Sequence, residues 1–267
     1  MPVARRCCLC VKEHGCLDRE RFLSAVSQVG CGDYKRDGIG TLSEGSVHAV
    51  LKKYFEPEND AQEVKIGSFV ADIAGENGII EIQTRAFHRL IKKLDCFLEY
   101  THVTVVYPIP KVKYVRWADP ETGELSKRRR SPKQCSIYDA FSELVKIKYA
   151  LQNPRFSFVA VLIEAEDIRL LDGYSANKKK GATKIDRVPT DIFEEYRFEC
   201  EEDYMMLVPY ELEGEFTSKD FAKAAGIKRE LAATTLNVLC SIGVTKKTGK
   251  RGRENIYTVS DDRKDNV

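Results

Sequence analysis

The chain has 267 residues, a length that suits one large domain or two smaller ones. Hydrophobic residues make up 43% and charged residues 31%, as in soluble globular proteins, and the net charge is +2. No apolar run approaches the ~20 residues of a membrane-spanning helix, and the N-terminus lacks the apolar core of a signal peptide. We therefore exclude a membrane protein, a secreted mini-protein and a disordered chain, and expect a cytoplasmic protein without membrane contact.

The first half of the chain predicts alternating helices and strands. Apolar spacing and β-branched alternation predict, in order, helices over 17–29 and 44–55, strands over 62–74 and 79–84, a helix over 86–99 and a strand over 102–107. The strand over 62–74 is long enough to bend into two, and Gly75–Gly78 forms a hairpin turn after it. The strand over 102–107 is apolar on both faces, which predicts a central position, and Pro108 and Pro110 end it.

The second half predicts a hairpin and then mostly helices. The expected elements are a basic hairpin within 111–134, a helix over 136–151, a buried strand over 156–165, a basic loop over 174–187 and a helix over 203–212. Two helices, 216–226 and 227–243, then meet at a glycine turn and precede a short hairpin with a basic tip. This last pattern resembles a winged helix-turn-helix domain, which implies contact with DNA.

The charges of this nearly neutral chain are segregated. Residues 111–134 hold eight basic and three acidic side chains, and residues 246–253 hold five basic ones. Residues 191–215 hold ten acidic side chains and one basic one, Arg197. The two basic runs indicate contact with a polyanion such as DNA, although solvated loops would have the same composition.

Nine cysteines, an odd number, indicate a reducing compartment in which thiols stay free. Cys7 and Cys10 have the spacing of one half of a zinc knuckle, and Cys16 lies nearby. The matching second half is missing, so we expect a thiol-rich N-terminal segment and no structural zinc.

Two carboxylates mark the most informative segment. Asp72 lies near the end of one predicted strand, and Glu81 and Gln83 project from one face of the next strand because they are two residues apart. The hairpin turn brings Asp72 and Glu81 together. Paired carboxylates can hold Mg²⁺ or Mn²⁺, which activates water and polarises a phosphate. Alternatively, the acids are exposed strand ends and Gln83 is a polar cross-strand partner.

The order of elements and acids resembles the PD-(D/E)xK (restriction-endonuclease-like) nuclease superfamily. That family has an α-β-β-β-α-β core, with one acid on the opening helix, an Asp at a strand end and Glu-x-Lys on the next strand. The resemblance implies a catalytic set of Glu44, Asp72, Glu81 and Gln83. It also implies that Asp72 and Glu81 bind the metal.

Gln83 stands where the family usually has lysine, as in some of its restriction enzymes. Lys52 shares a helix face with Glu44, and Lys92 lies on the following helix, so either lysine is a candidate substitute. His48 shares the Glu44 face as well. Glu44 by itself is also explained as an acid at a helix N-terminus.

We therefore expect an α/β fold in three parts. These are a Cys-rich segment and helix over 1–35, a nuclease-like domain with a basic hairpin insertion over 36–190, and a winged-helix domain over 203–260. Eight residues are expected to contact DNA: Arg128, Arg129 and Arg130 on the hairpin, Lys228 and Arg229 at the start of the last helix, and Lys250, Arg251 and Arg253 on the wing.

The predicted function is metal-dependent hydrolysis of DNA. The alternative is a non-catalytic DNA-binding or regulatory protein on a nuclease-like scaffold, which Gln83 favours. A weaker alternative is a protein adaptor that uses the acidic run over 191–215. A homodimer is left open.

Overall fold

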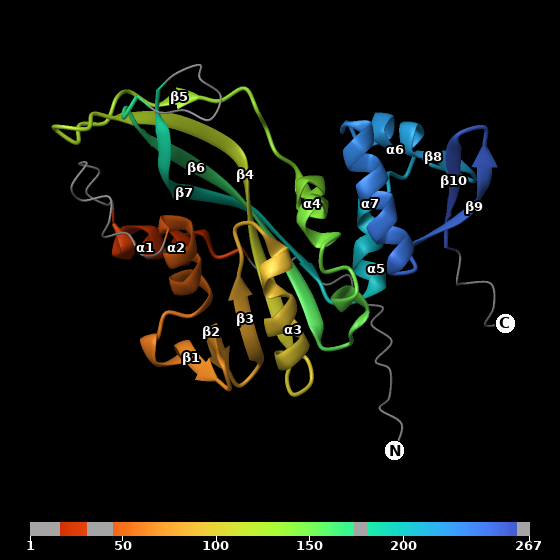
Figure 1. Ribbon diagram of the computed structural model, residues 1–267, viewed down its shortest axis with the longest axis horizontal. Coiled ribbons are helices and arrows are strands. Elements are labelled where there is room, and N and C mark those ends of the chain that lie inside the picture. The colour runs from red at the N-terminus through yellow and green to blue at the C-terminus, as the bar shows by residue number, and fades with distance from the viewer. Residues whose placement is uncertain (1–16, 31–44, 174–180, 261–267) are drawn as a thin grey trace.

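A computed structural model describes residues 17–30, 45–173 and 181–260. They form a mixed α/β structure with one large mixed sheet and one small sheet, as the sequence predicts in outline (Figure 1). The large sheet has the order β1-β2-β3-β4-β6-β7, with β5 paired to β4. Its strands are β1 (Gln62–Ile66), β2 (Phe69–Gly75), β3 (Gly78–Ile82), β4 (Val103–Ala118), β5 (Arg129–Arg130), β6 (Phe156–Leu170) and β7 (Thr183–Phe198).

The helices of the first half cover both faces of this sheet. They are α1 (Arg19–Val29), α2 (Ser46–Phe55) and α3 (Ile91–Phe97), with short 3₁₀ turns η2 (Asn59–Ala61) and η3 (Phe87–Leu90). The apolar stripes of α1 and α2 pack in one cluster with Ile82 and Val106 of the sheet. On the other face, Leu94 and Phe97 of α3 pack against Ile79. Figure 1 shows α1 and α2 on one side of the sheet and α3 on the other.

The predicted strand over 62–74 is two antiparallel strands, β1 and β2, and Gly67 has a φ of +60° in the turn between them. β2 and β3 form the predicted hairpin, and β4 then runs parallel to β3. The crossover between β3 and β4 contains η3 and α3. The observed order from α2 to β4 is therefore helix, three antiparallel strands, helix and a parallel strand.

β4 contradicts the prediction that Pro108 and Pro110 end the strand, because it continues to Ala118. The N–H of Gln83 donates to the carbonyl of Val106, so the even-numbered residues here direct their backbone polar groups toward β3. β3 ends opposite Val106, so on that side of β4 no part of β3 lies beside Pro108 and Pro110 to accept an N–H. The missing N–H of each proline therefore costs no hydrogen bond with β3, and the strand can continue. The basic hairpin is consequently an extension of the main sheet, in which β4 pairs with β6 as far as Ala118.

Three other element predictions were wrong. Residues 136–151 do not form one helix but short pieces: η4 (Ile137–Ala140), α4 (Phe141–Leu144) and η5 (Ala150–Gln152). Of the expected basic loop over 174–187, residues 183–187 begin strand β7, whose long antiparallel pairing with β6 has no local signal. The helix expected over 203–212 is reduced to α5 (Glu201–Tyr204) and η6 (Met205–Leu207), and residues 209–212 are not helical.

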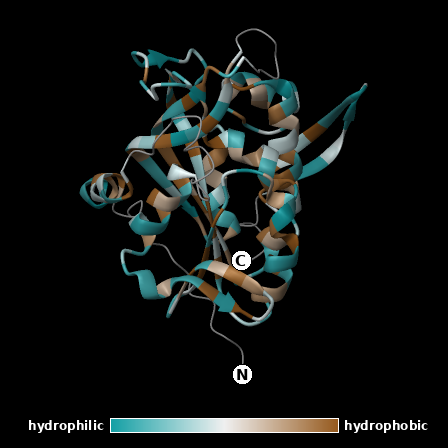
Figure 2. Cartoon of the chain, turned by 60° about the vertical axis from the view of Figure 1, so that its left-hand side comes forward, coloured by the Kyte–Doolittle hydropathy of each residue, from teal (hydrophilic) through white to brown (hydrophobic). Residues whose placement is uncertain are grey.

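The C-terminal elements match the prediction more closely. They are α6 (Ser218–Ala224), α7 (Arg229–Ser241), and a three-stranded sheet of β8 (Phe216–Thr217), β9 (Thr245–Arg251) and β10 (Glu254–Val259). Thr217 caps α6 in a capping box with Asp220. Phe221 of α6 and Leu236 of α7 belong to the same buried cluster as Phe158 of the large sheet, so this region packs directly on the rest of the protein. Figure 2 shows that hydrophobic and hydrophilic residues are interspersed along the helices and strands of the chain.

Candidate active site

Asp72 and Glu81 lie opposite one another at the open end of the β2–β3 hairpin. The backbone pairs of the hairpin end at Ile73 and Ile80. Beyond them, the N–H of Ile82 donates to Oδ2 of Asp72 at 2.7 Å, and the N–H of Asp72 donates to Oε1 of Glu81 at 3.4 Å. The carboxylates thus replace backbone acceptors where the two strands separate, which brings both acids to one place as the sequence predicts.

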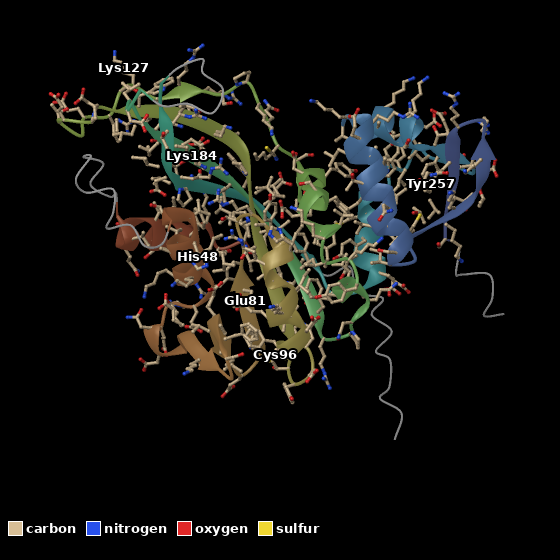
Figure 3. The ribbon with its side chains drawn as sticks, in the orientation of Figure 1. His48, Glu81, Cys96, Lys127, Lys184 and Tyr257 are labelled. Atoms are coloured by element: carbon tan, nitrogen blue, oxygen red, sulfur yellow. The ribbon has the colours of Figure 1, made fainter. Side chains whose placement is uncertain are left out.

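His48 of α2 reaches Asp72 from one face of the sheet. Its Nε2 lies 3.1 Å from Oδ2 of Asp72. The buried neighbours Val47 and Val50 anchor α2 to the sheet and so place His48 (Figure 3). Burial of Asp72 opposes its ionisation, but the hydrogen bond and charge of His48 and the N–H of Ile82 outweigh it, so the pKa of Asp72 is below its usual value.

Lys93 of α3 reaches Glu81 from the other face. Its Nζ lies 2.8 Å from Oε2 of Glu81, a residue that is only 2% exposed. Burial, and then the charge of Asp72, raise the pKa of Glu81 to about 7, whereas Lys93 acts in the opposite direction. His48, Asp72, Glu81 and Lys93 therefore form a continuous polar chain through the sheet.

The remaining predicted site residues lie differently. The side-chain amide of Gln83 donates to the carbonyl of Arg85, so it does not contact either carboxylate through this group. Lys52 pairs with Glu63 at 2.8 Å, and Lys92 is exposed. Neither lysine therefore takes the predicted place beside the acids.

Lys93 takes that place, and sequence reasoning missed it. The usable signal was its position next to Leu94 at the border of the apolar stripe of α3. Glu44 lies outside the described residues, immediately before Gly45, the N-cap of α2. Cys7, Cys10 and Cys16 also lie outside them.

The donor set fits a hard divalent cation in part. Asp72 and Glu81 supply adjacent carboxylate oxygens, the ligand type that Mg²⁺ prefers, and Mg²⁺ usually completes its shell with water and substrate phosphate. Within residues 17–30, 45–173 and 181–260, no group of three or more His, Cys, Asp or Glu side chains is arranged to hold a metal. Asp72 and Glu81 are thus the two protein ligands that this site offers within that part of the chain.

The predicted DNA-contacting residues of the hairpin are exposed. Arg129 and Arg130 form β5, and Arg128 stacks 3.5 Å from the centre of the Tyr114 ring while its Nη2 donates to Glu164 at 2.8 Å. Tyr114 and Arg128 therefore form an aromatic-basic surface on the hairpin. Among the described residues, no helix is long and apolar enough to cross a membrane.

The predicted wing residues also lie on the surface. Lys250 and Arg253 are exposed, and Arg251 lies 3.9 Å from Glu215. At the start of α7, Lys228 is the N-cap residue and Arg229 pairs with Glu254 at 2.6 Å. Further along α7, Asn237 accepts a hydrogen bond from Lys148, so this side of the helix faces the body of the protein.

Comparison with known proteins gives a family. A family model described as a domain of unknown function, DUF8091, matches residues 45–199. The chain belongs to this family. The DUF8091 match begins at the N-cap of α2 and ends just after β7, so it contains His48, Asp72, Glu81 and Lys93 and the whole large sheet.

One relative extends beyond that region. A protein of Treponema pallidum (strain Nichols), named only as an uncharacterized protein, is 29% identical over 221 residues, which are 82% of this chain and 86% of that protein. No solved structure matches the chain.

Proposed function

We propose that this DUF8091 protein is a metal-dependent nuclease of the PD-(D/E)xK type that hydrolyses DNA phosphodiester bonds. The observation that carries this proposal is the convergence of Asp72 and Glu81 from consecutive strands, with Lys93 2.8 Å from Glu81. The order of α2, β1, β2, β3, α3 and β4, with β4 parallel to β3, agrees with the α-β-β-β-α-β core of that superfamily.

The residues of the site approach the two acids from both faces of the sheet. Asp72 and Glu81 would hold the cation, which supplies polarisation of the phosphate and a more acidic water. His48 is a positioning residue, because its contact at 3.1 Å keeps the Asp72 carboxylate ionised and oriented. Lys93 brings a positive charge to Glu81 and would stabilise negative charge that develops on the phosphate.

DNA is the proposed substrate because basic surfaces lie outside the site. The exposed arginines of β5 and the wing residues Lys250 and Arg253 supply phosphate contacts without sequence information. The packing of α6 and α7 beside β8, β9 and β10 supports a winged helix that holds the substrate.

Cleavage assays test the proposal on plasmid, linear and branched DNA with Mg²⁺ or Mn²⁺. Asp72→Asn and Glu81→Gln should each lower the rate at least about 100-fold, as expected when a cation loses a ligand. Glu76→Gln is the matched control, because Glu76 is an exposed acid in the turn at the other end of the same hairpin. Equal rates in the wild type and both site variants would overturn the proposal, as would the absence of cleavage of every substrate.

The second candidate is a DNA-binding protein that does not cut. Its supporting observation is that the side chain of Gln83 is turned to the carbonyl of Arg85, so Gln83 does not supply what the family's lysine supplies. Calorimetric titration with Mn²⁺ separates the candidates. Salt-dependent DNA binding without any Mn²⁺ binding favours the second, and Mn²⁺ binding that Asp72→Asn abolishes favours the nuclease.

A further inference from the structure

A basic hollow lies on the sheet beyond the proposed active site. It has a volume of about 240 Å³ and is lined by apolar and polar residues from β4, β7 and the segment before α4. Its lining includes Tyr107, Pro110, Lys113, Lys133, Cys135 and Arg187. The hollow is large enough for a phosphate group with part of a nucleoside.

The hollow carries an excess of positive charge. Lys113, Lys133 and Arg187 line it, against one lining acid, Asp139. Oδ2 of Asp139 accepts the N–H of Ser136 at 2.8 Å, and three cations line the hollow against this one acid. Among the described residues, the exposed ammonium group of Lys133 forms no hydrogen bond or ion pair, so it remains able to bind an anion.

A buried carboxylate holds two of the cations in place. Asp167, which is 2% exposed, accepts hydrogen bonds from Nε and Nη2 of Arg187 at 2.6 and 3.1 Å. Lys184 and Lys113 approach the same carboxylate at 3.2 and 3.7 Å. The Asp167 carboxylate is therefore shared by three cations. Nη1 of Arg187 does not contact this carboxylate and remains to donate to a ligand. Such a fixed, incompletely neutralised cluster is suited to a phosphate.

The hollow continues the same face of the sheet as Glu81. Glu81 pairs with Val105 of β4, and Val105, Tyr107 and Ile109 alternate along that strand on the face covered by α3. Tyr107 thus lies one step beyond the site and lines the hollow. In Figure 3, Lys184 lies along the sheet between Glu81 and Lys127 at the hairpin.

We propose that this hollow binds the terminal phosphate of a nucleotide, with Lys113, Lys133 and Arg187 on the phosphate and Tyr107 and Pro110 against the attached nucleoside. The inference deepens the proposed function by assigning a subsite for the substrate, but it needs neither the metal nor cleavage. The nucleotide is either the phosphorylated end of a DNA strand or a free mononucleotide, since both present the same group.

Binding is measured in EDTA by fluorescence anisotropy, so that no cleavage occurs and failure of the nuclease proposal does not affect the result. The probes are a short labelled single-stranded oligonucleotide with a 5′-phosphate, the same strand with a 3′-phosphate, and the strand without either. Competition with AMP and with inorganic phosphate tests the free nucleotide. We expect one phosphorylated strand to bind about 10-fold more tightly than the unphosphorylated strand, as the loss of one charged hydrogen bond would imply.

The variant Lys133→Gln should remove this difference without affecting folding, because Lys133 is exposed. Lys127→Gln is the matched control: it removes the same charge from the nearby hairpin, where it is also exposed, and should lower the affinity for all three strands equally. Equal affinities of the wild type for all three strands, together with no competition by AMP, would overturn the proposal. An equal loss of affinity in Lys133→Gln and Lys127→Gln would also overturn it. Lys133 would then attract DNA only through its charge, as any other surface lysine does.

Competition by AMP without preference for a phosphorylated strand would support the hollow and assign it to a free nucleotide. Cys135 gives an independent readout, because it lines the hollow and is a free thiol. Ligand should slow alkylation of Cys135 and leave alkylation of the exposed Cys200 unchanged, as measured by peptide mass spectrometry. Unchanged alkylation of Cys135 under saturating ligand would place the ligand elsewhere.

Discussion

Nζ of Lys93 lies 2.8 Å from Oε2 of Glu81, so a helix on one face of the sheet supplies the cation beside this buried acid. In the sequence this lysine is 12 residues from Glu81, on the crossover that returns the chain from β3 to β4. The parallel crossover therefore gives the site a positive charge that the strand itself, with Gln83, lacks.

Replacement of Lys93 by Met should lower both stability and activity. It leaves the buried Glu81 carboxyl without its cation, which should cost about 1–3 kcal/mol of the free energy of unfolding. Cleavage should fall by at least about 10-fold, since stabilisation of phosphate charge is lost. The control is Lys92→Met, which removes the exposed neighbouring lysine. Urea denaturation and the cleavage assay check both effects, and equal results for the two variants would contradict the role of Lys93.

Replacement of Asp167 by Asn should destabilise the protein strongly. The side chain is 3% exposed and faces Lys113, Lys184 and Arg187, which would repel one another without it. Removing one partner from a buried ion pair typically costs about 3–5 kcal/mol of the free energy of unfolding. Urea denaturation measures the loss, with Glu121→Gln on the exposed hairpin turn as the control. A loss below that of the control would show that the cluster contributes nothing to folding.

Replacement of Lys250, Arg251 and Arg253 by Ala should weaken DNA binding similarly for all sequences. If each contacts one phosphate, the slope of log affinity against log salt should decrease in magnitude by about 0.9 for each lost contact. Lys65→Ala, an exposed lysine of β1, controls for general charge. Salt titrations of the wild type and the variants decide the outcome: identical slopes and affinities would leave the wing without a role in DNA binding.

Tyr54 should make the protein sensitive to alkaline pH. Burial, and then the charge of Glu195, raise the pKa of Tyr54 to about 12, whereas a tyrosine in the unfolded chain titrates near 10. Its contribution to stability is therefore complete below pH ~10 and is lost as the pH rises toward 12, because the unfolded state releases the proton first.

Tyr54→Phe tests this dependence. The variant should be less stable than the wild type at pH 7 by about 1 kcal/mol, because the hydroxyl donates to Glu195. The difference should shrink at pH 11 in urea denaturation. Tyr210→Phe, at a position that is 89% exposed, should match the wild type at both values. A constant difference for Tyr54→Phe at both values would contradict the prediction.

The sequence by itself determined the helices α1 and α2, the β2–β3 hairpin and the pair of acids. Phe22 belongs to the apolar stripe of α1 and Val50 to that of α2, and both residues are in the core. Each stripe has helical spacing because a helix of this kind buries one face. Asp72 and Glu81 were predictable because a short hairpin turn leaves little freedom in how its two strands pair. These features depend on residues close together along the chain.

Only the tertiary structure decided features that depend on distant pairing. β4 runs through Pro108 and Pro110 because β3 happens to end beside it, and β7 is a strand because β6 offers its edge. Lys93 reaches Glu81 because α3 packs against the sheet, and Lys113, Lys184 and Arg187 gather on Asp167 because β4, β6 and β7 are neighbours within that sheet. The residues around a charged side chain, whether next to an apolar stripe or within a basic run, do not indicate which residue it will pair with. The position of that partner follows from burial of the whole core and not from the neighbouring residues.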